Sequence, residues 1–138
     1  MNREFRRDLP IYTQLVGQFE QDIASGAMPP GERLPSVRDL AADLGVNPNT
    51  VQRALQELER EGLVFTQRTS GRFVTEDVAA IARCKKTLGE RQIKEFLAAM
   101  TLLGYRRQEI IDLLQSSHPL SSPSPPAFSL SQHQDLFK

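Results

Sequence analysis

The chain has 138 residues, with 17 basic and 17 acidic side chains and a formal net charge of zero. This length allows one compact core, or one small domain with an appendage, and excludes a large additional sensor domain. Because the charges balance, the totals do not indicate a polyanion-binding protein, and any basic surface has to be local.

Cysteine content and hydropathy restrict the compartment. The single Cys84 excludes an intramolecular disulfide, and the N-terminal sequence MNREFRRD lacks the apolar run of a secretory signal. No stretch is apolar enough to span a membrane. We therefore expect a cytoplasmic protein with no membrane partner.

The first part of the chain contains arginine and no lysine. All nine basic residues between positions 1 and 75 are arginines, and ten acidic residues share that stretch. Guanidinium groups suit forked contacts with phosphates and base edges. A high-GC gene produces the same bias without a functional cause, so the pattern favours a nucleic-acid partner only weakly.

The first predicted helix covers residues 10–25. Its apolar residues recur at helical spacing, Pro10 suits a first-turn position, and Gly26 suits the stop. The next residues read AMPPGERLP, and their proline and glycine content predicts a turn with a short extended piece.

Two further helices are predicted in quick succession. Ser36 is a suitable N-cap, with Asp39 three residues on, for a short helix that ends near Gly45. Asn47 and Pro48 form a second start signal, for a helix that runs to about residue 62. The apolar face of that helix comprises Val51, Ala54, Leu55 and Leu58.

A hairpin and two more helices complete the predicted elements. The runs LVFTQR and RFVT predict two short strands joined by Thr69, Ser70 and Gly71, with Gly71 at positive φ in the turn. Helical spacing then returns from residue 76 to Gly104 and again over about 105–116. The Ser/Pro-rich stretch 117–138 cannot bury enough apolar surface to order, so we expect a disordered tail.

The two central helices have the spacing of a helix-turn-helix. Ala41 lets the helices cross closely, and Gly45 makes the turn between them. In such a unit the second helix presents its outward face to the major groove of DNA, where Asn and Gln side chains pair bidentately with adenine. Phosphates should repel Glu57, Glu59 and Glu61, so only the first two turns should enter the groove. The outward residues are Pro48, Asn49, Gln52, Arg53 and Gln56.

The hairpin is a candidate wing. Arg68 and Arg72 flank a narrow tip of small residues, which suits insertion beside the minor groove, although a surface arginine is more often simply solvated.

The acidic end of the second helix of this unit leaves an alternative function from another class, a protein-protein module that does not bind DNA. The fold class is accordingly mainly α with a small β-hairpin wing.

These residues carry a resemblance to a known family. The stretch PIYTQLVGQFEQDIASGAMPPGERLPS and the following LPSVRDLAADLGVNPNTVQRALQELEREGLVFTQRTSGRFV resemble the DNA-binding domain of the GntR family of bacterial regulators. The G-E-R-L-P-S corner, the T-V-x-x-A-L-x-x-L-E core and the closing F-V fall at family spacing, over about half of the chain. The NPNTVQRA variant and the short two-helix tail resemble the YtrA subfamily.

The resemblance implies contacts with double-stranded operator DNA. The family's contact residues fall on Arg38 before the second helix and on the wing tip near Ser70 and Gly71. Two departures affect the wing, since Thr69 replaces the family's first wing glycine and Arg72 replaces its usual threonine. The contacts at the start of the recognition helix fall on Asn47, Asn49, Thr50 and Gln52.

The resemblance also implies a homodimer and, often in the subfamily, repression of genes for an ABC-type exporter. The helix from residue 76 to 103 has an apolar stripe that one short following helix covers only in part, so the remainder should meet a second copy. We take residues 1–75 as the DNA-binding domain, 76–116 as a two-helix dimerisation segment and 117–138 as the tail. The expected interface residues are Ile81, Leu88, Phe96, Met100 and Leu103.

No other chemistry is indicated. His118 and His133 lie in the tail and Cys84 stands alone, so we expect no metal site, and no catalytic motif or cofactor loop is present. We therefore expect no enzyme activity and no cofactor.

A small-molecule effector would have to bind in a groove between subunits, or between the two helices and the DNA-binding domain. A piece of a longer regulator fused to an aminotransferase-like domain is the disfavoured alternative.

Overall fold

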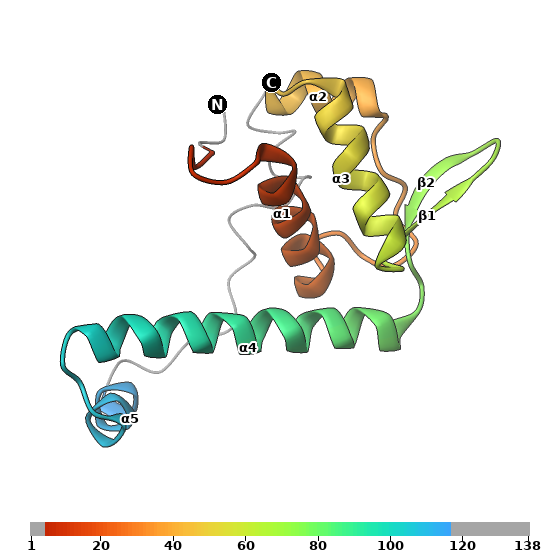
Figure 1. The fold of residues 1–138 in the computed structure, drawn as a ribbon. Coiled ribbons are helices and arrows are strands. Elements are labelled where there is room, and N and C mark those ends of the chain that lie inside the picture. The colour runs from red at the N-terminus through yellow and green to blue at the C-terminus, as the bar shows by residue number, and fades with distance from the viewer. Residues whose placement is uncertain (1–4, 117–138) are drawn as a thin grey trace. The chain divides into compact units, whose positions relative to one another are not determined.

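The computed structural model of the chain describes residues 5–116 (Figure 1). The described chain divides into two compact units, residues 5–85 and 86–116, with the boundary inside one helix, and we describe each unit by itself. The elements are α1 (Ile11–Ser25), α2 (Val37–Leu44), α3 (Pro48–Arg60), β1 (Val64–Gln67), β2 (Gly71–Val74), α4 (Val78–Leu102) and α5 (Arg107–Ser116).

Helix α1 confirms the first predicted helix with one correction at its start. Pro10 is the N-cap and not a first-turn residue, because its ψ of 141° is extended. Gly26 ends the helix in the left-handed region at φ 85°, as its position predicts. The helix buries Leu15, Phe19 and Ile23.

Helices α2 and α3 form the predicted helix-turn-helix. The Ser36 hydroxyl accepts a hydrogen bond from the backbone N–H of Asp39 at 3.1 Å, and Gly45 closes α2 at φ 67°. The side-chain oxygen of Asn47 accepts from the backbone N–H of Asn49 at 2.8 Å, and Pro48 is the first residue of α3. Both predicted N-caps are therefore confirmed.

Strands β1 and β2 form an antiparallel pair that extends from the end of α3 (Figure 1). Gly71 pairs with Gln67 and so opens β2, whereas the sequence places it in the turn; its positive φ of 108° is confirmed. The predicted extended piece lies along β2, because the N–H of Leu34 donates to the carbonyl of Arg72 at 2.8 Å. This pairing ties the segment before α2 to the wing.

The core of the first unit lies between α1, α2, α3 and the base of the hairpin. Ile81 and Cys84 on the first turns of α4 pack against this core. Ile81 is half-buried there, and its place in the interface with a second copy stays a prediction. The fully buried large residues include Leu15, Phe19, Ile23, Leu40, Leu55, Leu58, Leu63 and Val74.

The second unit comprises the rest of α4 and α5. Gly104, at φ 93°, forms the turn between them, and Ile110 of α5 is buried. Several large apolar side chains on these elements and on the turn between them are exposed, among them Leu102 (90% exposed) at the end of α4 and Leu103 (73% exposed) in the turn. No helix within residues 5–116 is long and apolar enough to cross a membrane. The expected disordered tail and its two histidines lie outside the described residues.

Candidate nucleic-acid interface

Helix α3 has an apolar inner face and a polar outer face. Val51, Ala54, Leu55 and Leu58 are 0% exposed, so the helix is fixed against the core along its whole length. On the opposite side Pro48, Asn49, Arg53 and Gln56 are exposed and Gln52 is half-buried. The predicted outward set is therefore brought together on one surface of the helix.

The two remaining residues at the start of α3 have different surroundings. Asn47 is exposed, but its side-chain oxygen is engaged in capping, which leaves its amide N–H groups to donate outward. Thr50 is half-buried in the first turn. The open N-terminus of α3 adds the partial positive charge of the helix dipole at this end.

Arg53 lies over an aromatic ring. Its guanidinium carbon is 3.8 Å from the centre of the Tyr12 ring on α1. A cation in this position is attracted by the electron-rich face of the ring. Arg53 thus remains exposed while its side chain is held in one direction along the outer face of the helix.

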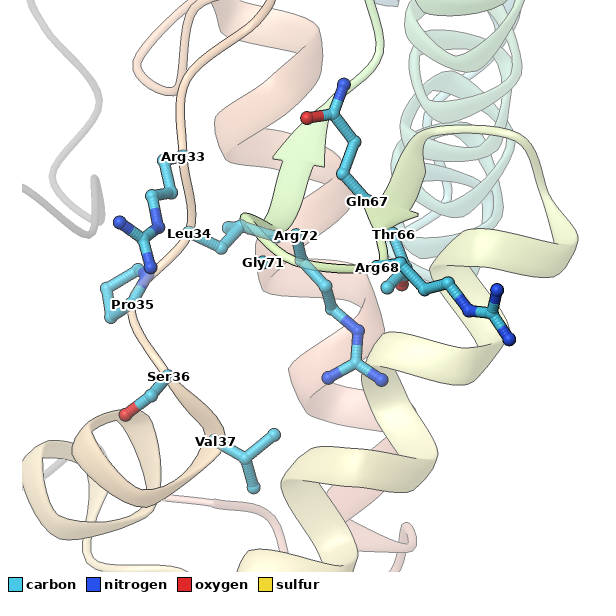
Figure 2. A pocket seen from close by; sticks show the side chains of 10 residues that line it. All are labelled: Arg33, Leu34, Pro35, Ser36, Val37, Thr66, Gln67, Arg68, Gly71 and Arg72. Atoms are coloured by element: carbon cyan, nitrogen blue, oxygen red, sulfur yellow. The ribbon is translucent and has the colours of Figure 1, made fainter.

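Arg72 of the wing points back toward α3 (Figure 2). Its Nε–H donates to Glu59 Oε1 at 2.8 Å, and one of its terminal nitrogens donates to the side-chain oxygen of Gln52 at 3.3 Å. The Thr66 hydroxyl donates to the same oxygen of Glu59. Arg72, with a side chain 19% exposed, therefore connects the wing to the recognition helix.

The tip of the wing is exposed. Arg68, Thr69 and Ser70 form the turn, in which the Ser70 N–H donates to the carbonyl of Gln67 at 3.1 Å. A Cβ at Gly71 would lie 3.2 Å from Nε of Arg33 and would impose a strained φ. The glycine therefore allows the Arg33 side chain to pass close to the hairpin.

An open pocket of about 320 Å³ lies between the wing and the segment that leads into α2 (Figure 2). Three arginines, Arg33, Arg68 and Arg72, line it together with the N-cap Ser36. The first turn of α2 also presents the exposed Arg38. Guanidinium groups and a helix N-terminus are the groups that bind phosphate oxygens.

No group of residues with the composition of a metal site occurs within the described part of the chain. The arrangement is that of a binding surface, with amides and arginines on the outer face of α3 and further arginines around the wing.

Comparison with known proteins identifies the domain. A sequence model of the bacterial regulatory proteins of the gntR family matches residues 11–74. The HTH-type transcriptional regulator YhcF of Bacillus subtilis is 35% identical over 112 residues, which are 81% of this chain and 93% of YhcF. The chain belongs to the GntR family. The resemblance seen in the sequence is confirmed.

Within the family this GntR regulator is YtrA-like. The transcriptional repressor YtrA of Bacillus subtilis is 40% identical over 93 residues, 67% of this chain and 72% of YtrA. A GntR-family regulator from Listeria monocytogenes matches with a TM-score of 0.75 at 34% identity, over 83% of this chain and all of that chain. These relatives are transcription regulators, so the chain is a DNA-binding regulator and not an enzyme.

The acidic end of α3 in this GntR regulator is partly neutralised. Arg60 donates to Glu57, and this bond lowers the pKa of Glu57. Burial raises the pKa of Glu59, but hydrogen bonds from Thr66 and Arg72 outweigh it and hold the pKa below its ordinary value. Two of the three predicted repulsive carboxylates are therefore paired.

Glu61 is different. It is an exposed residue whose carboxyl nevertheless faces that of Glu20 on α1. Partial burial, a hydrogen bond with Glu20 and repulsion between the two carboxyls raise the pKa of Glu61 to about 8. At neutral pH this residue adds little negative charge to the interface.

Three residues that contact this surface could not be predicted from the sequence of the GntR regulator. Tyr12 reads as an apolar helix position, Glu59 as one of a row of solvated acids, and Arg33 as part of a turn. Their roles depend on contacts between elements distant in the chain.

Proposed function

We propose that the chain is a homodimeric repressor that binds an inverted-repeat operator in the cytoplasm through the start of α3. The observation that carries the proposal is the polar outer face of α3, fixed by a fully buried inner face. Side chains that read bases must be held in place by a rigid element, and this helix meets that condition.

The proposed contacts divide into two kinds. Asn49 and Gln52 lie in the first two turns of α3, where side chains reach base edges, while Arg38 and Arg68 are exposed cations suited to phosphates. Phosphate contacts position the protein and base contacts specify the sequence. The remaining proposed contact residues are Asn47, Pro48, Thr50, Arg53, Ser70 and Gly71.

The proposed dimer uses the apolar residues of the second unit. Phe96 is 42% exposed and Leu103 73% exposed, and Met100 lies between them in α4. Leu88, which precedes Phe96 in α4, is half-buried. A two-fold pair of such segments presents two recognition helices to DNA, so half-sites should repeat about one helical turn apart.

The genes under control are proposed from the subfamily. The relative YtrA is named a transcriptional repressor, and genes for an ABC-type exporter are the expected target. An effector molecule would bind in a groove between the two subunits, or between the two helices and the DNA-binding domain, because two helices enclose no pocket in one subunit.

The test is selection of bound duplexes from a randomised pool by the full chain, together with sedimentation. We expect selected sequences to contain an inverted repeat and the protein to sediment as a dimer at micromolar concentration. Phe96→Asp with Met100→Asp places charge in the interface and should give a monomer with weak DNA binding. A wild-type monomer that binds one half-site tightly would contradict the dimer and the palindrome.

A protein-protein module is the alternative function. The acids at the end of α3 favour this alternative, but the pairing of Glu57 and Glu59 weakens that argument. A gel shift with the gene's own upstream region separates the two, because a protein-binding module retards no duplex.

A further inference from the structure

We propose that Glu59 holds the wing in its DNA-binding position through Arg72 and Thr66, so that this acid increases the affinity for DNA. We call the contact of these three side chains the Glu59 bridge. The inference rests on the proposed function, in which the exposed Arg68 of the wing contacts a phosphate. Glu59 and Arg72 are positioning residues, because they act through Arg68 and not by touching DNA.

The Glu59 bridge joins one residue of α3 to both strands of the wing. The Nε–H of Arg72 donates to Glu59 Oε1 at 2.8 Å, and the Thr66 hydroxyl donates to the same oxygen. Thr66 in β1 and Arg72 in β2 are partners in the strand register, so one carboxylate fixes the two strands at the same level.

This ion pair is sheltered from solvent. Of the ion pairs in residues 5–116 it has the least exposed side chains, at 19% for Arg72 and 31% for Glu59. Salt screens a partly buried pair less than an exposed one, so the contact persists at the salt concentrations at which DNA is bound. Burial raises the pKa of Glu59, but the bonds from Thr66 and Arg72 outweigh it and keep the carboxyl in its charged form.

The other contacts of the wing hold its base and one edge. Val64 and Val74 are buried at the base, whereas residues 65–70 are exposed. Along the edge, the N–H of Leu34 donates to the carbonyl of Arg72 at 2.8 Å, within the plane of the strands. A two-stranded hairpin is marginally stable on its own. These contacts alone therefore leave the outer part of the wing able to bend out of that plane.

The Glu59 bridge opposes that bending. Register partners project from the same face of a pair of strands, so the side chains of Thr66 and Arg72 both leave the face that meets α3 (Figure 2). The turn that carries Arg68 begins two residues after Thr66. Loss of the bridge should therefore release Arg68 from the position in which it meets a phosphate.

The charge of Glu59 alone gives the opposite expectation. An acid beside DNA repels phosphates, so its removal should raise affinity or leave it unchanged. If Arg72 contacted phosphate directly, removal of Glu59 would also free the guanidinium and strengthen binding. The bridge predicts that removal weakens binding, and the sign of the effect separates these possibilities.

The experiment measures dissociation constants of the full chain for its selected operator at several salt concentrations. Glu59→Ala breaks the bridge, whereas Glu59→Gln has the same charge as that variant but keeps an oxygen that accepts hydrogen bonds. Glu57→Ala is the matched control, because Glu57 is 32% exposed on the same helix and its ion pair is with Arg60 of that helix. Arg68→Ala is made in the wild type and in Glu59→Ala.

We expect Arg68→Ala to weaken the wild type about 10-fold, since it removes a charge-assisted bond to phosphate. Glu59→Ala should weaken binding by a similar factor and lower the salt slope by about 1, because the same phosphate contact is lost. Glu59→Gln should restore part of the affinity, and Glu57→Ala should bind at least as tightly as the wild type. In the Glu59→Ala background, Arg68→Ala should cost about 3-fold or less.

The dependence of Arg68 on Glu59 distinguishes positioning from a loss of stability. A variant that is folded at the binding temperature, but merely less stable, retains the full cost of Arg68→Ala. If Glu59→Ala shows no thermal unfolding transition, Arg72→Met breaks the same ion pair from the wing. Arg68→Ala should again cost about 3-fold or less in that background.

Three results would overturn the inference: a folded Glu59→Ala variant that binds as tightly as the wild type, a full cost of Arg68→Ala in that variant, or no effect of Arg68→Ala in the wild type. Each leaves the preference of the wild type for its operator intact. A wild type that binds a scrambled duplex as tightly as its operator would instead overturn the docking of α3 and the inference with it. The two failures are therefore distinguishable.

Discussion

The guanidinium of Arg53 lies 3.8 Å from the centre of the Tyr12 ring, which links the outer face of the recognition helix to α1. Tyr12 also packs against the core. One aromatic ring thus packs against the core on its inner side and directs a cation on the proposed DNA-binding surface.

A double-mutant cycle tests this link. Tyr12→Leu, Arg53→Ala and the double variant should show a coupling energy of about 0.5–1 kcal/mol in the free energy of unfolding from urea denaturation. Tyr12→Phe keeps the ring and should remain close to the wild type. Strictly additive effects of the two single substitutions would show that the stacking contributes nothing.

Removal of the α2 cap should lower stability. Ser36→Ala leaves the N–H of Asp39 without its side-chain acceptor and should cost about 1 kcal/mol, a fall of several degrees in melting temperature. Ser36→Asp keeps an acceptor and should restore most of the loss. Ser70→Ala, on the exposed wing turn, is the matched control and should melt as the wild type does. Equal melting temperatures for Ser36→Ala and Ser70→Ala would contradict the capping role.

Glu61 should make the protein less stable as pH rises. Its pKa is raised to about 8 in the folded chain against an ordinary 4.5, so between these values the folded state holds a proton that the unfolded state has released. Stability from this group is complete below about pH 4.5 and is lost by about pH 8. Solvent screening at an exposed residue keeps the effect to about 1 kcal/mol or less.

Glu61→Gln should therefore flatten the decline in urea midpoint between pH 5 and pH 8.5. Glu57→Gln is the control, because the bond from Arg60 lowers the pKa of Glu57, so this carboxyl titrates below that pH window and its removal should leave the slope unchanged. An unchanged slope in Glu61→Gln would show that Glu20 and Glu61 do not share a proton.

Arg38 should contribute affinity without specificity. Arg38→Ala removes an exposed cation from the first turn of α2 and should weaken binding to all sequences, with a salt slope reduced by about 1. Arg83→Ala, an exposed arginine on α4, should change neither quantity. Fluorescence anisotropy titrations at several salt concentrations measure both, and an unaltered slope in Arg38→Ala would remove this residue from the interface.

Local signals in the sequence predict most of the fold. The N-caps Ser36 and Asn47 and the terminators Gly26 and Gly45 act on backbone groups within a few residues, so their sequence patterns are sufficient to locate the helix ends. The outward face of α3 follows from periodicity alone.

Contacts between elements are less predictable. The bond from Arg72 to Gln52 joins residues 20 apart and depends on how the hairpin leans toward α3. Ile81 has the spacing of an exposed stripe, but it packs against the core of its own unit because α4 begins beside that core. Such placements arise from packing angles that no local pattern encodes.

The most direct test compares the affinity of the full chain for its selected operator with that for a scrambled duplex of equal length, at one salt concentration. We predict a ratio of about 10³ or more for the wild type. Asn49→Ala combined with Gln52→Ala should lower the ratio by at least 10-fold while binding to the scrambled duplex is kept. Gln21→Ala, on the exposed side of α1, should leave it unchanged. Equal affinity of the wild type for both duplexes, or an intact ratio in the double variant, would contradict recognition through the start of α3.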